Sequence, residues 1–540
     1  MARTTTFRNP HAGATDDSTS QMGDVSLTRM FVMTAAFEGS QVAWGVQMGI
    51  ATPTFFMLGV GPAAAALIWL AGPVSGVVAQ PIIGAWSDRC DSAMGKRRPF
   101  VLAATVVVVI TTITFGYAKR IGHFFGDGPN AGDAKPIAVF ISILAFWVLD
   151  FGINALMGPM RALSSDRFSE KQQATASGIF ALHVGLGNCI SFGLGAMNLA
   201  SFGCGSQVES LSVAGSIAIA ILGACTLVLA TECRQPDDEV SIATDSEVMP
   251  GASGSVSPEG IALCALDMPA NHVSSSVLRL SKRVIITWRE TFKAFPQSVK
   301  IAFAAQFMTS IGKNGSLMFV TAWFGEVVYG GNPRAEEGSS SLAIFEEGVR
   351  MGSFALLAAG IMCGVFGLAL PLLLLLLQTK RFVWAVALSL GAMALFFMSI
   401  LSHDVTLTFA LTTLLGIALG ARESIPWSIV TAASKDCGNA GANTAVFNLS
   451  QSLPGLFGAL MGSLVLQIGS LPAVFGVCAV PLVSAVFIIL TYFSEDIEAV
   501  ETSHLLGIGG QWKFSNPACN PEVESGAVIG CRDDAFHSRN

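Results

Sequence analysis

The chain has 540 residues, of which 52% are hydrophobic and only 12% are charged, and its mean hydropathy is +0.60. Soluble domains usually carry about 25% charged residues, so this composition excludes an ordinary soluble enzyme, a disordered chain and a disulfide-rich secreted domain. The net charge of −7 does not indicate nucleic-acid binding. The 11 cysteines form no Cys-x-x-Cys pair, and we expect neither a metal nor another cofactor. The composition fits a polytopic membrane protein, with roughly 20 apolar residues per span.

In chain order, residues 1–28 are polar and predict a cytosolic tail without the apolar core of a signal peptide. The N-terminal half (29–230) and the C-terminal half (299–493) each contain six apolar segments, separated by a polar loop at 231–298 and followed by a tail at 494–540. The twelve segments lie at about 29–58, 63–87, 100–118, 136–160, 174–203, 211–230, 300–325, 351–377, 383–401, 404–433, 443–468 and 472–493. This pattern predicts an all-α membrane protein of 12 transmembrane helices in two six-helix halves.

The two halves resemble each other, which favours a duplication. Phe180 follows Pro159 by the same 21 residues that separate Phe447 from Pro426. Paired halves of this kind usually rock around a central site in transporters. Small residues four apart let helices approach closely, and each half has such a pair in its second span: Gly72 with Gly76, and Gly360 with Gly364.

Lys and Arg gather in the loops between spans 2 and 3, 4 and 5, and 8 and 9, and positively charged loops stay in the cytosol. Both tails and the central loop are therefore predicted to be cytosolic. The second half of that loop alternates apolar and basic residues at helical spacing over 279–295. It predicts either an amphipathic helix on the inner leaflet or a plain extension of span 7.

Charged residues inside the predicted spans need an explanation, because a charge in the hydrocarbon layer is expensive. Asp150 and Arg161 lie three turns apart on one face of span 4, about 16 Å apart along the axis. A lone buried carboxylate can load and release a proton near neutral pH; alternatively, Asp150 pairs permanently with a buried cation. The other intramembrane charges are Glu38, Lys313, Arg422 and Glu423.

Polar and aromatic side chains of spans 1 and 4 suit a sugar. Gln41, Trp44 and Gln47 are spaced three apart in span 1, and Asn154 lies one turn after Asp150. Amides hydrogen-bond hydroxyl groups, and an indole stacks on the apolar face of a sugar ring. The alternative is that these side chains make ordinary polar contacts between helices.

A glycine-rich, charged loop follows span 2, from Gly84 to Arg98. We interpret it as a cytosolic latch between helices, with an orientation signal alone as the alternative. The latch candidates are Asp88, Arg89, Gly95, Arg97 and Arg98.

These residues resemble the major facilitator superfamily, and more specifically the glycoside–pentoside–hexuronide:cation symporter type that includes plant sucrose transporters and animal solute carrier family 45. The resemblance is carried in the first half by the loop after span 2 and by the sequence from Gln41 to Pro99. Span 4 adds Leu149-Asp150, Asn154, Gly158-Pro159, Arg161-Ala162-Leu163 and Asp166. The second half matches more loosely, through Trp323, Gly325, 328–331, 348–350, 424–426 and 448–449.

The resemblance implies proton-coupled uptake of sucrose or a related glucoside, with Asp150 tied to proton coupling and sugar contact and Arg161 tied to transport. The chain departs from the family both by lacking residues that the family has and by carrying charges that the family does not. Ala322 stands where the family has Asp, and Pro62 where plant members often have His. Lys313, Arg422 and Glu423 stand where uncharged residues are expected. Lys313 and Glu423 could pair across the cavity.

We therefore predict a symporter that works by alternating access, with Asp150 and Arg161 in proton coupling. Its substrate contacts are predicted to be Gln41, Trp44, Gln47, Asp150, Asn154 and Arg161. The expected partners are a small sugar, protons and the lipid bilayer, without nucleic acid, and the plasma membrane is favoured over a vacuolar or lysosomal one. A transporter of a monosaccharide, polyol or other organic solute and a non-transporting sugar sensor are the alternatives, and no catalytic constellation favours an enzyme. The oligomeric state stays open.

Overall fold

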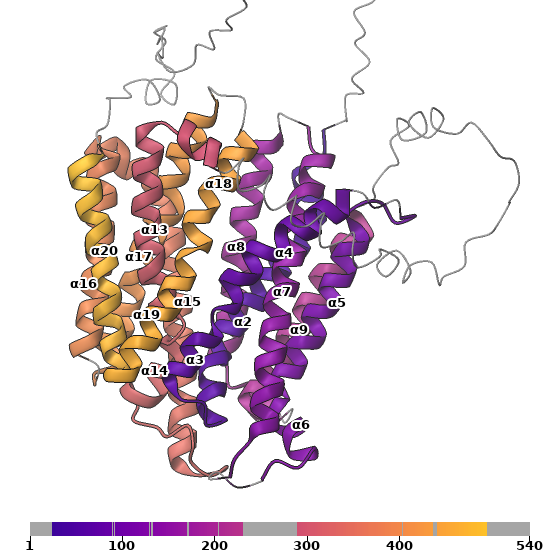
Figure 1. The fold of residues 1–540 in the computed structure, drawn as a ribbon, viewed down its shortest axis with the longest axis vertical. Coiled ribbons are helices and arrows are strands. Elements are labelled where there is room, and N and C mark those ends of the chain that lie inside the picture. Colours follow the sequence, from indigo (N-terminus) through magenta and orange to yellow (C-terminus); the bar gives the residue numbers. More distant parts are fainter. Residues whose placement is uncertain are drawn as a thin grey trace, which may run out of the picture.

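A computed structural model describes residues 24–88, 90, 92–128, 130, 133–169, 172–202, 205–230, 289–401, 403–435 and 440–493. These residues form helices and no strands. The helices run nearly parallel in two groups, one from each half of the chain (Figure 1). The expected tails, and the central loop up to residue 288, lie outside the described residues; of the predicted amphipathic helix only the end is described, where 289–294 are helical.

The N-terminal half consists of helices that pack mainly against one another. Helix α2 contacts α8 and α9, while α7 contacts α4 and α5. The elements are α1 (Leu27–Met33), α2 (Ala35–Met57), α3 (Pro62–Ile68), α4 (Ala71–Asp88), α5 (Arg98–Gly116), α6 (Ala118–Phe124), α7 (Pro136–Arg167), α8 (Gln173–Ala196), the short 3₁₀ helix η2 (Leu199–Phe202) and α9 (Gln207–Leu229).

The C-terminal half repeats this arrangement. Helix α20 contacts α13 and α16, while α17 contacts α15 and α16. The elements are α13 (Gln297–Leu317), α14 (Val320–Trp323), the π-helix η4 (Phe324–Val328), α15 (Ser340–Leu377), α16 (Lys380–Ile400), α17 (Val405–Lys435), α18 (Ala440–Ser452), α19 (Pro454–Ile468) and α20 (Leu471–Tyr492).

Several helices begin where the sequence supplies a start signal. Proline occupies the first turn of α3, α5, α7, α19 and α20, where its missing N–H costs nothing. Ser206 and Glu209 form a reciprocal capping box at the start of α9. Gly59 takes a φ of 89° in the turn after α2, a conformation that favours glycine.

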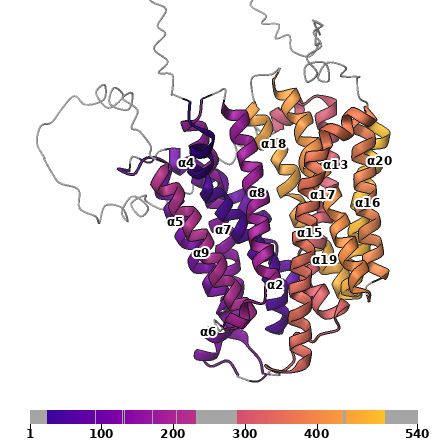
Figure 2. The ribbon, with the colours of Figure 1, turned by 180° about the vertical axis from the view of Figure 1, so that it is seen from behind.

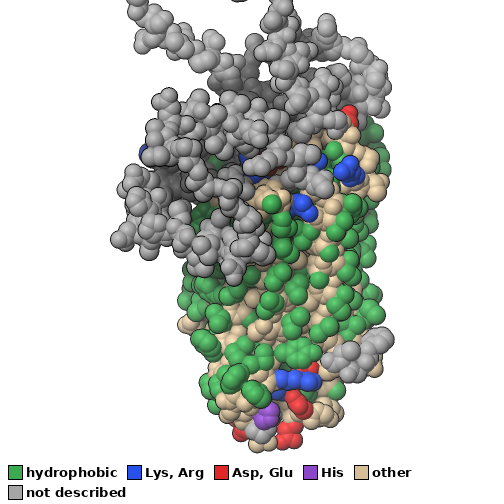
Figure 3. Space-filling view, turned by 90° about the vertical axis from the view of Figure 1, so that its right-hand side faces the viewer, with side chains coloured by type: hydrophobic (Ala, Val, Ile, Leu, Met, Phe, Trp, Pro, Cys, Tyr) green, Lys and Arg blue, Asp and Glu red, His purple; other side chains and the backbone are tan. Residues whose placement is uncertain are grey.

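Ten helices of the described segments are long and apolar enough to cross a membrane. On the face that Figure 3 shows, hydrophobic side chains cover the middle of the molecule and charged ones lie toward its two ends. The expected spans 1 and 7 coincide with α2 and α13, which are helical but not among the ten. Both carry buried polar side chains, including Gln41 and Gln47 in α2 and Gln306 and Ser310 in α13. The all-helical membrane fold is confirmed, while the count of twelve depends on including these two helices.

The halves meet most closely at the end opposite the basic loops, which we call the outer end, following the predicted orientation. The ribbons of the two halves converge at this end and diverge toward the inner end (Figures 1 and 2). Thr321 Oγ1 donates to the carbonyl of Met48 at 3.4 Å, and α3 packs against α19. At the outer surface, Lys119 forms an ion pair with Glu337 and holds the pKa of that carboxyl below its ordinary value through its hydrogen bond and charge.

The glycine pair of the first half lies at a close contact between helices, whereas the prediction that Gly360 and Gly364 do the same in the second half is wrong. A Cβ on Gly72 or Gly76 would lie 3.7 Å from Asp150 or 3.4 Å from Asn154, so this pair gives α4 its close approach to α7. A Cβ on Gly360 or Gly364 would meet nothing within 4 Å among the described residues. The four-residue spacing fixes a helix face but does not say whether a neighbour covers it.

The close contact in the second half lies instead at Gly416, where α17 crosses α15. A Cβ at this position would lie 2.2 Å from the backbone oxygen of Ala359. We expect Gly416→Ala to destabilise the protein by about 1–3 kcal/mol through overpacking, whereas Gly364→Ala should be neutral or slightly stabilising. Thermal unfolding of the purified protein in detergent checks this, and equal melting temperatures for the two variants would contradict it.

Candidate substrate and proton site

Asp150 lies in the middle of α7 and is buried, with 4% of its surface exposed. Gln47 Nε2 donates a hydrogen bond of 3.1 Å to Asp150 Oδ2 from α2. No Lys, Arg or His of the described segments forms an ion pair with Asp150. The alternative of a permanent buried cation partner therefore finds no support in the described residues.

One of the predicted sugar contacts of α2, Gln47, lies at this carboxylate. Gln47 is buried, and its Oε1 has no hydrogen-bond partner among the described residues. Trp44 is half-buried one turn earlier, and Gln41 Nε2 donates to Ser40 Oγ at 3.3 Å. The face of α2 that meets Asp150 therefore has an amide oxygen available to accept a hydrogen bond.

Asn154 is already bonded to its neighbours. Its Nδ2 donates to Ser75 Oγ at 2.9 Å and to the carbonyl of Asp150 at 3.0 Å, and its Oδ1 accepts from Gln80 Nε2 at 2.8 Å. These bonds join α7 to α4, which is the interhelical contact that the sequence left open as an alternative.

Arg161 does not meet Asp150 in this structure. Its side chain is exposed, and the guanidinium carbon lies 5.7 Å from the centre of the Phe37 ring on α2. The three turns of α7 that separate the two residues keep their charged groups apart, so a direct role of Arg161 in orienting Asp150 would require a different conformation.

The charged residues of the C-terminal half are not arranged as expected. Arg422 pairs with its neighbour Glu423 and donates to Ser310 Oγ at 3.0 Å. Lys313 lies over the ring of Trp44, with 5.3 Å between its Nζ and the ring centre. The hypothesis that Lys313 pairs with Glu423 is therefore wrong in this conformation, because Arg422 is adjacent to Glu423 and takes its carboxylate.

A buried row of hydrogen-bonded polar side chains, which the sequence pattern does not predict, links α2 to α8. His183 of α8 is fully buried, and its Nδ1 lies 2.9 Å from Glu38 Oε2 while its Nε2 lies 2.9 Å from Thr34 Oγ1. The sequence predicts Glu38 as an intramembrane charge, but nothing in the local sequence of α2 indicates a partner on α8. These bonds account for Glu38 as a link between two helices.

In the loop after α4, two arginines of the predicted latch bond neighbouring helices. Arg97 Nε lies 2.8 Å from Asp166 Oδ2 of α7, and its Nη1 donates to Ser87 Oγ at 2.6 Å. Arg98 bonds the carbonyl of Leu227 on α9, and Gly95 takes a φ of 98°. The side chains of Asp88 and Arg89 lie outside the described residues, so the latch stays a prediction.

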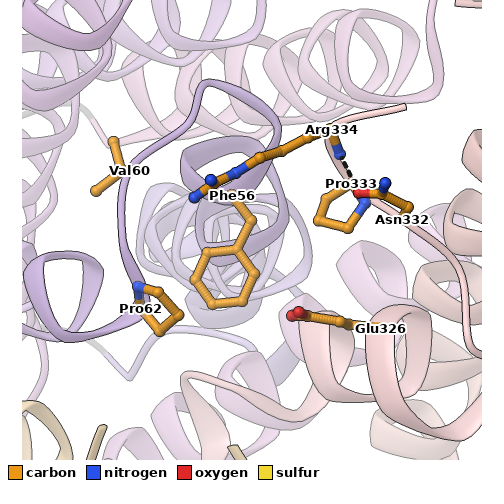
Figure 4. Close-up of a pocket in the computed structure, with 7 residues that line it drawn as sticks. All are labelled: Phe56, Val60, Pro62, Glu326, Asn332, Pro333 and Arg334. Carbon is orange, nitrogen blue, oxygen red and sulfur yellow. Dashed lines mark hydrogen bonds between the residues drawn. The ribbon is translucent and has the colours of Figure 1, made fainter. Parts of the chain in front are cut away.

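A pocket of about 280 Å³ lies at the outer end, between the α2–α3 turn and the segment after η4. Figure 4 shows Glu326 and Arg334 on either side of Phe56. Arg334 Nη2 donates to the carbonyl of Gly59 at 3.4 Å, which joins the two halves. Pro62, one of the departures from the resembled family, lines this pocket.

Comparisons with known proteins agree with this architecture. The sequence model of the Major Facilitator Superfamily matches residues 39–459. The chain belongs to the Major Facilitator Superfamily. It is a member of a transporter family and not an enzyme.

The chain is similar to plant sucrose transport proteins. It is 26% identical over 492 residues to sucrose transport protein SUC3 of Arabidopsis thaliana, covering 81% of this chain and 82% of that protein. It is 29% identical over 443 residues to SUC4 of the same plant, covering 77% and 80%.

Solved structures share the fold. The crystal structure of the nucleoside transporter NupG has a TM-score of 0.53 at 13% identity, with 87% of this chain and all (100%) of that one covered. A D-xylose–proton symporter has a TM-score of 0.52 at 15% identity, covering 87% and 99%. At these identities the likeness concerns the fold alone.

Proposed function

We propose that this superfamily member is a proton-coupled symporter of sucrose or a related disaccharide or glucoside, working by alternating access. The observation that carries the proposal is Asp150, a buried carboxylate whose hydrogen bond comes from Gln47, on the helix that presents Trp44. The similarity to plant sucrose transport proteins supports the choice of a sugar. The plasma membrane is the proposed location.

The proposed coupling follows from the environment of Asp150. A carboxylate held away from water, without a cation, favours its protonated form. Protonation removes the buried charge of Asp150. A sugar hydroxyl that donates a hydrogen bond to the free amide oxygen of Gln47 adds binding energy at the same site. Each ligand shifts the equilibrium between conformations only by its differential affinity. The proton and the sugar therefore act together when both prefer the closed site.

The experiment is uptake of labelled sucrose into vesicles that contain the protein, at an outside pH of about 5 and about 7.5, with and without a protonophore. Acid-stimulated uptake that the protonophore abolishes is the expected result. A panel of monosaccharides, polyols and glucosides as competitors identifies the solute. Saturable uptake that ignores both pH and protonophore would contradict the proton coupling, and absence of all sugar uptake by folded protein would contradict the sugar.

A further inference from the structure

Two cations of the C-terminal half lie on or against α13, and one of them faces a predicted sugar contact of the N-terminal half. Lys313 reaches from α13 to the face of Trp44 on α2. Arg422 of α17 has only 1% of its surface exposed. Arg422 donates to Ser310 Oγ, which lies one turn before Lys313 on the same face of α13, so the two positive charges lie on one side of that helix. Such an arrangement is unfavourable unless something negative offsets it.

The positive charges of the two side chains are compensated differently. Arg422 has the Glu423 carboxylate and Ser310 Oγ as partners. Lys313 forms no ion pair with a carboxylate in the part of the chain that the structure describes, and its Nζ lies over the indole ring of Trp44. The side chain of Lys313 is only partly buried, and a cation–π contact of roughly 0.5–2 kcal/mol does not neutralise its charge. Lys313 therefore still lacks a counter-charge.

A second, independent observation lies on the same helix. Gln306 precedes Ser310 by four residues and Lys313 by seven, so all three share one face of α13. Its side chain is fully buried, and neither its amide nitrogen nor its amide oxygen has a hydrogen-bond partner among the described residues. Buried amides without partners are rare. The face of α13 that carries Lys313 thus also carries spare hydrogen-bonding groups.

We propose that the preferred substrate is a disaccharide or glucoside that carries an anionic group, a carboxylate or a phosphate ester, which Lys313 binds. This inference rests on the proposed function as a sugar transporter and adds the charge of the substrate. The site is polarised between the halves, with the Asp150 carboxyl in the N-terminal half and the cations in the C-terminal half. The sugar ring lies against Trp44 and Gln47, and the anionic group points toward α13.

The charge of the substrate determines how much net charge crosses the membrane in each transport cycle. With one proton carried per sugar, a neutral sugar moves one positive charge across the membrane, whereas a monoanionic sugar moves none. Uptake of a sugar carboxylate is therefore electroneutral and produces no current. This readout depends on the substrate's charge and not on how tightly it binds.

The test uses the full chain in proteoliposomes and two matched pairs of solutes. Methyl glucoside and methyl glucuronide differ by a carboxylate, and sucrose and a sucrose monophosphate differ by a phosphate ester, so the pairs separate the two anions. We expect the anionic member of one pair to have a KM at least about tenfold lower than its neutral partner, the effect of a charge-assisted hydrogen bond. Lys313→Gln should remove this preference, and Lys313→Arg should retain most of it.

The control is Lys300→Gln, which removes a lysine from the same helix 13 positions away, where it bonds the carbonyl of Lys293. It should leave the preference unchanged. Equal KM values within both pairs, or an unchanged preference in a folded Lys313→Gln variant, would overturn the anionic substrate while leaving sugar transport intact. If no sugar is transported and calorimetry on folded protein detects no binding, this inference and the proposed function both fail.

Discussion

Replacing Asp150 with Asn is expected to abolish proton-driven accumulation of sugar while leaving the site able to bind it. The amide has nearly the shape of the protonated acid but cannot release a proton. Gln47 lies 3.1 Å from the carboxylate oxygen and can still bond the amide oxygen of the variant. The coupling step is lost, whereas the hydrogen bond between α2 and α7 persists.

Two measurements on the same vesicles separate coupling from binding. Accumulation against a gradient, driven by an acidic exterior, should fall to the level of vesicles without the protein. With one proton per sugar, each unit of pH difference drives up to about a tenfold accumulation, so about two units make this a loss of about a hundredfold. Exchange of labelled for unlabelled sugar at equal concentrations should continue, because it needs no net proton movement. Glu290→Gln is the matched control, since the side chain of Glu290 is exposed and pairs with Lys293. Wild-type accumulation by Asp150→Asn would remove this residue from the coupling step.

The apolar segments predict where most helices lie but not where they end. The fourth segment ends at about residue 160 by composition, yet α7 continues to Arg167. The eighth begins at about residue 351, yet α15 begins at Ser340, where the side chain of Ser339 caps it. Composition reports which residues suit lipid, whereas helix length follows from backbone hydrogen bonds, which continue into water.

Residues within one helix are predicted more reliably than partners between helices. Gln41, Trp44 and Gln47 share a face because their spacing requires it. That Lys313 lies over Trp44, and that His183 bonds Glu38, depends on how α2 packs against α13 and α8. Single-sequence patterns do not contain that packing. The same limit explains why Gly360 and Gly364 matched Gly72 and Gly76 in spacing but not in contact.

A disulfide between α3 and α19 is expected to stop transport completely and reversibly. A Cβ on Gly462 would lie 3.8 Å from the Cβ of Ala66, which is buried at the outer contact between the halves. This separation matches the mean Cβ distance of about 3.8 Å in disulfides. The Ala66→Cys/Gly462→Cys double variant should therefore form the bond on mild oxidation. Uptake should fall to background and return after reduction.

A second disulfide inside one half tells a specific block from general damage. A Cβ on Gly39 of α2 would lie 3.6 Å from the Cβ of Leu222 on α9, so Gly39→Cys/Leu222→Cys joins two helices of the N-terminal half. If the halves move as rigid bodies, this bond leaves transport nearly unchanged although its geometry matches that of the first. Undiminished uptake by the oxidised α3–α19 variant, with the bond confirmed by mass spectrometry, would show that the outer contact does not open. In that case alternating access between these halves would be wrong, because a site between them reaches the outer side only if α3 separates from α19.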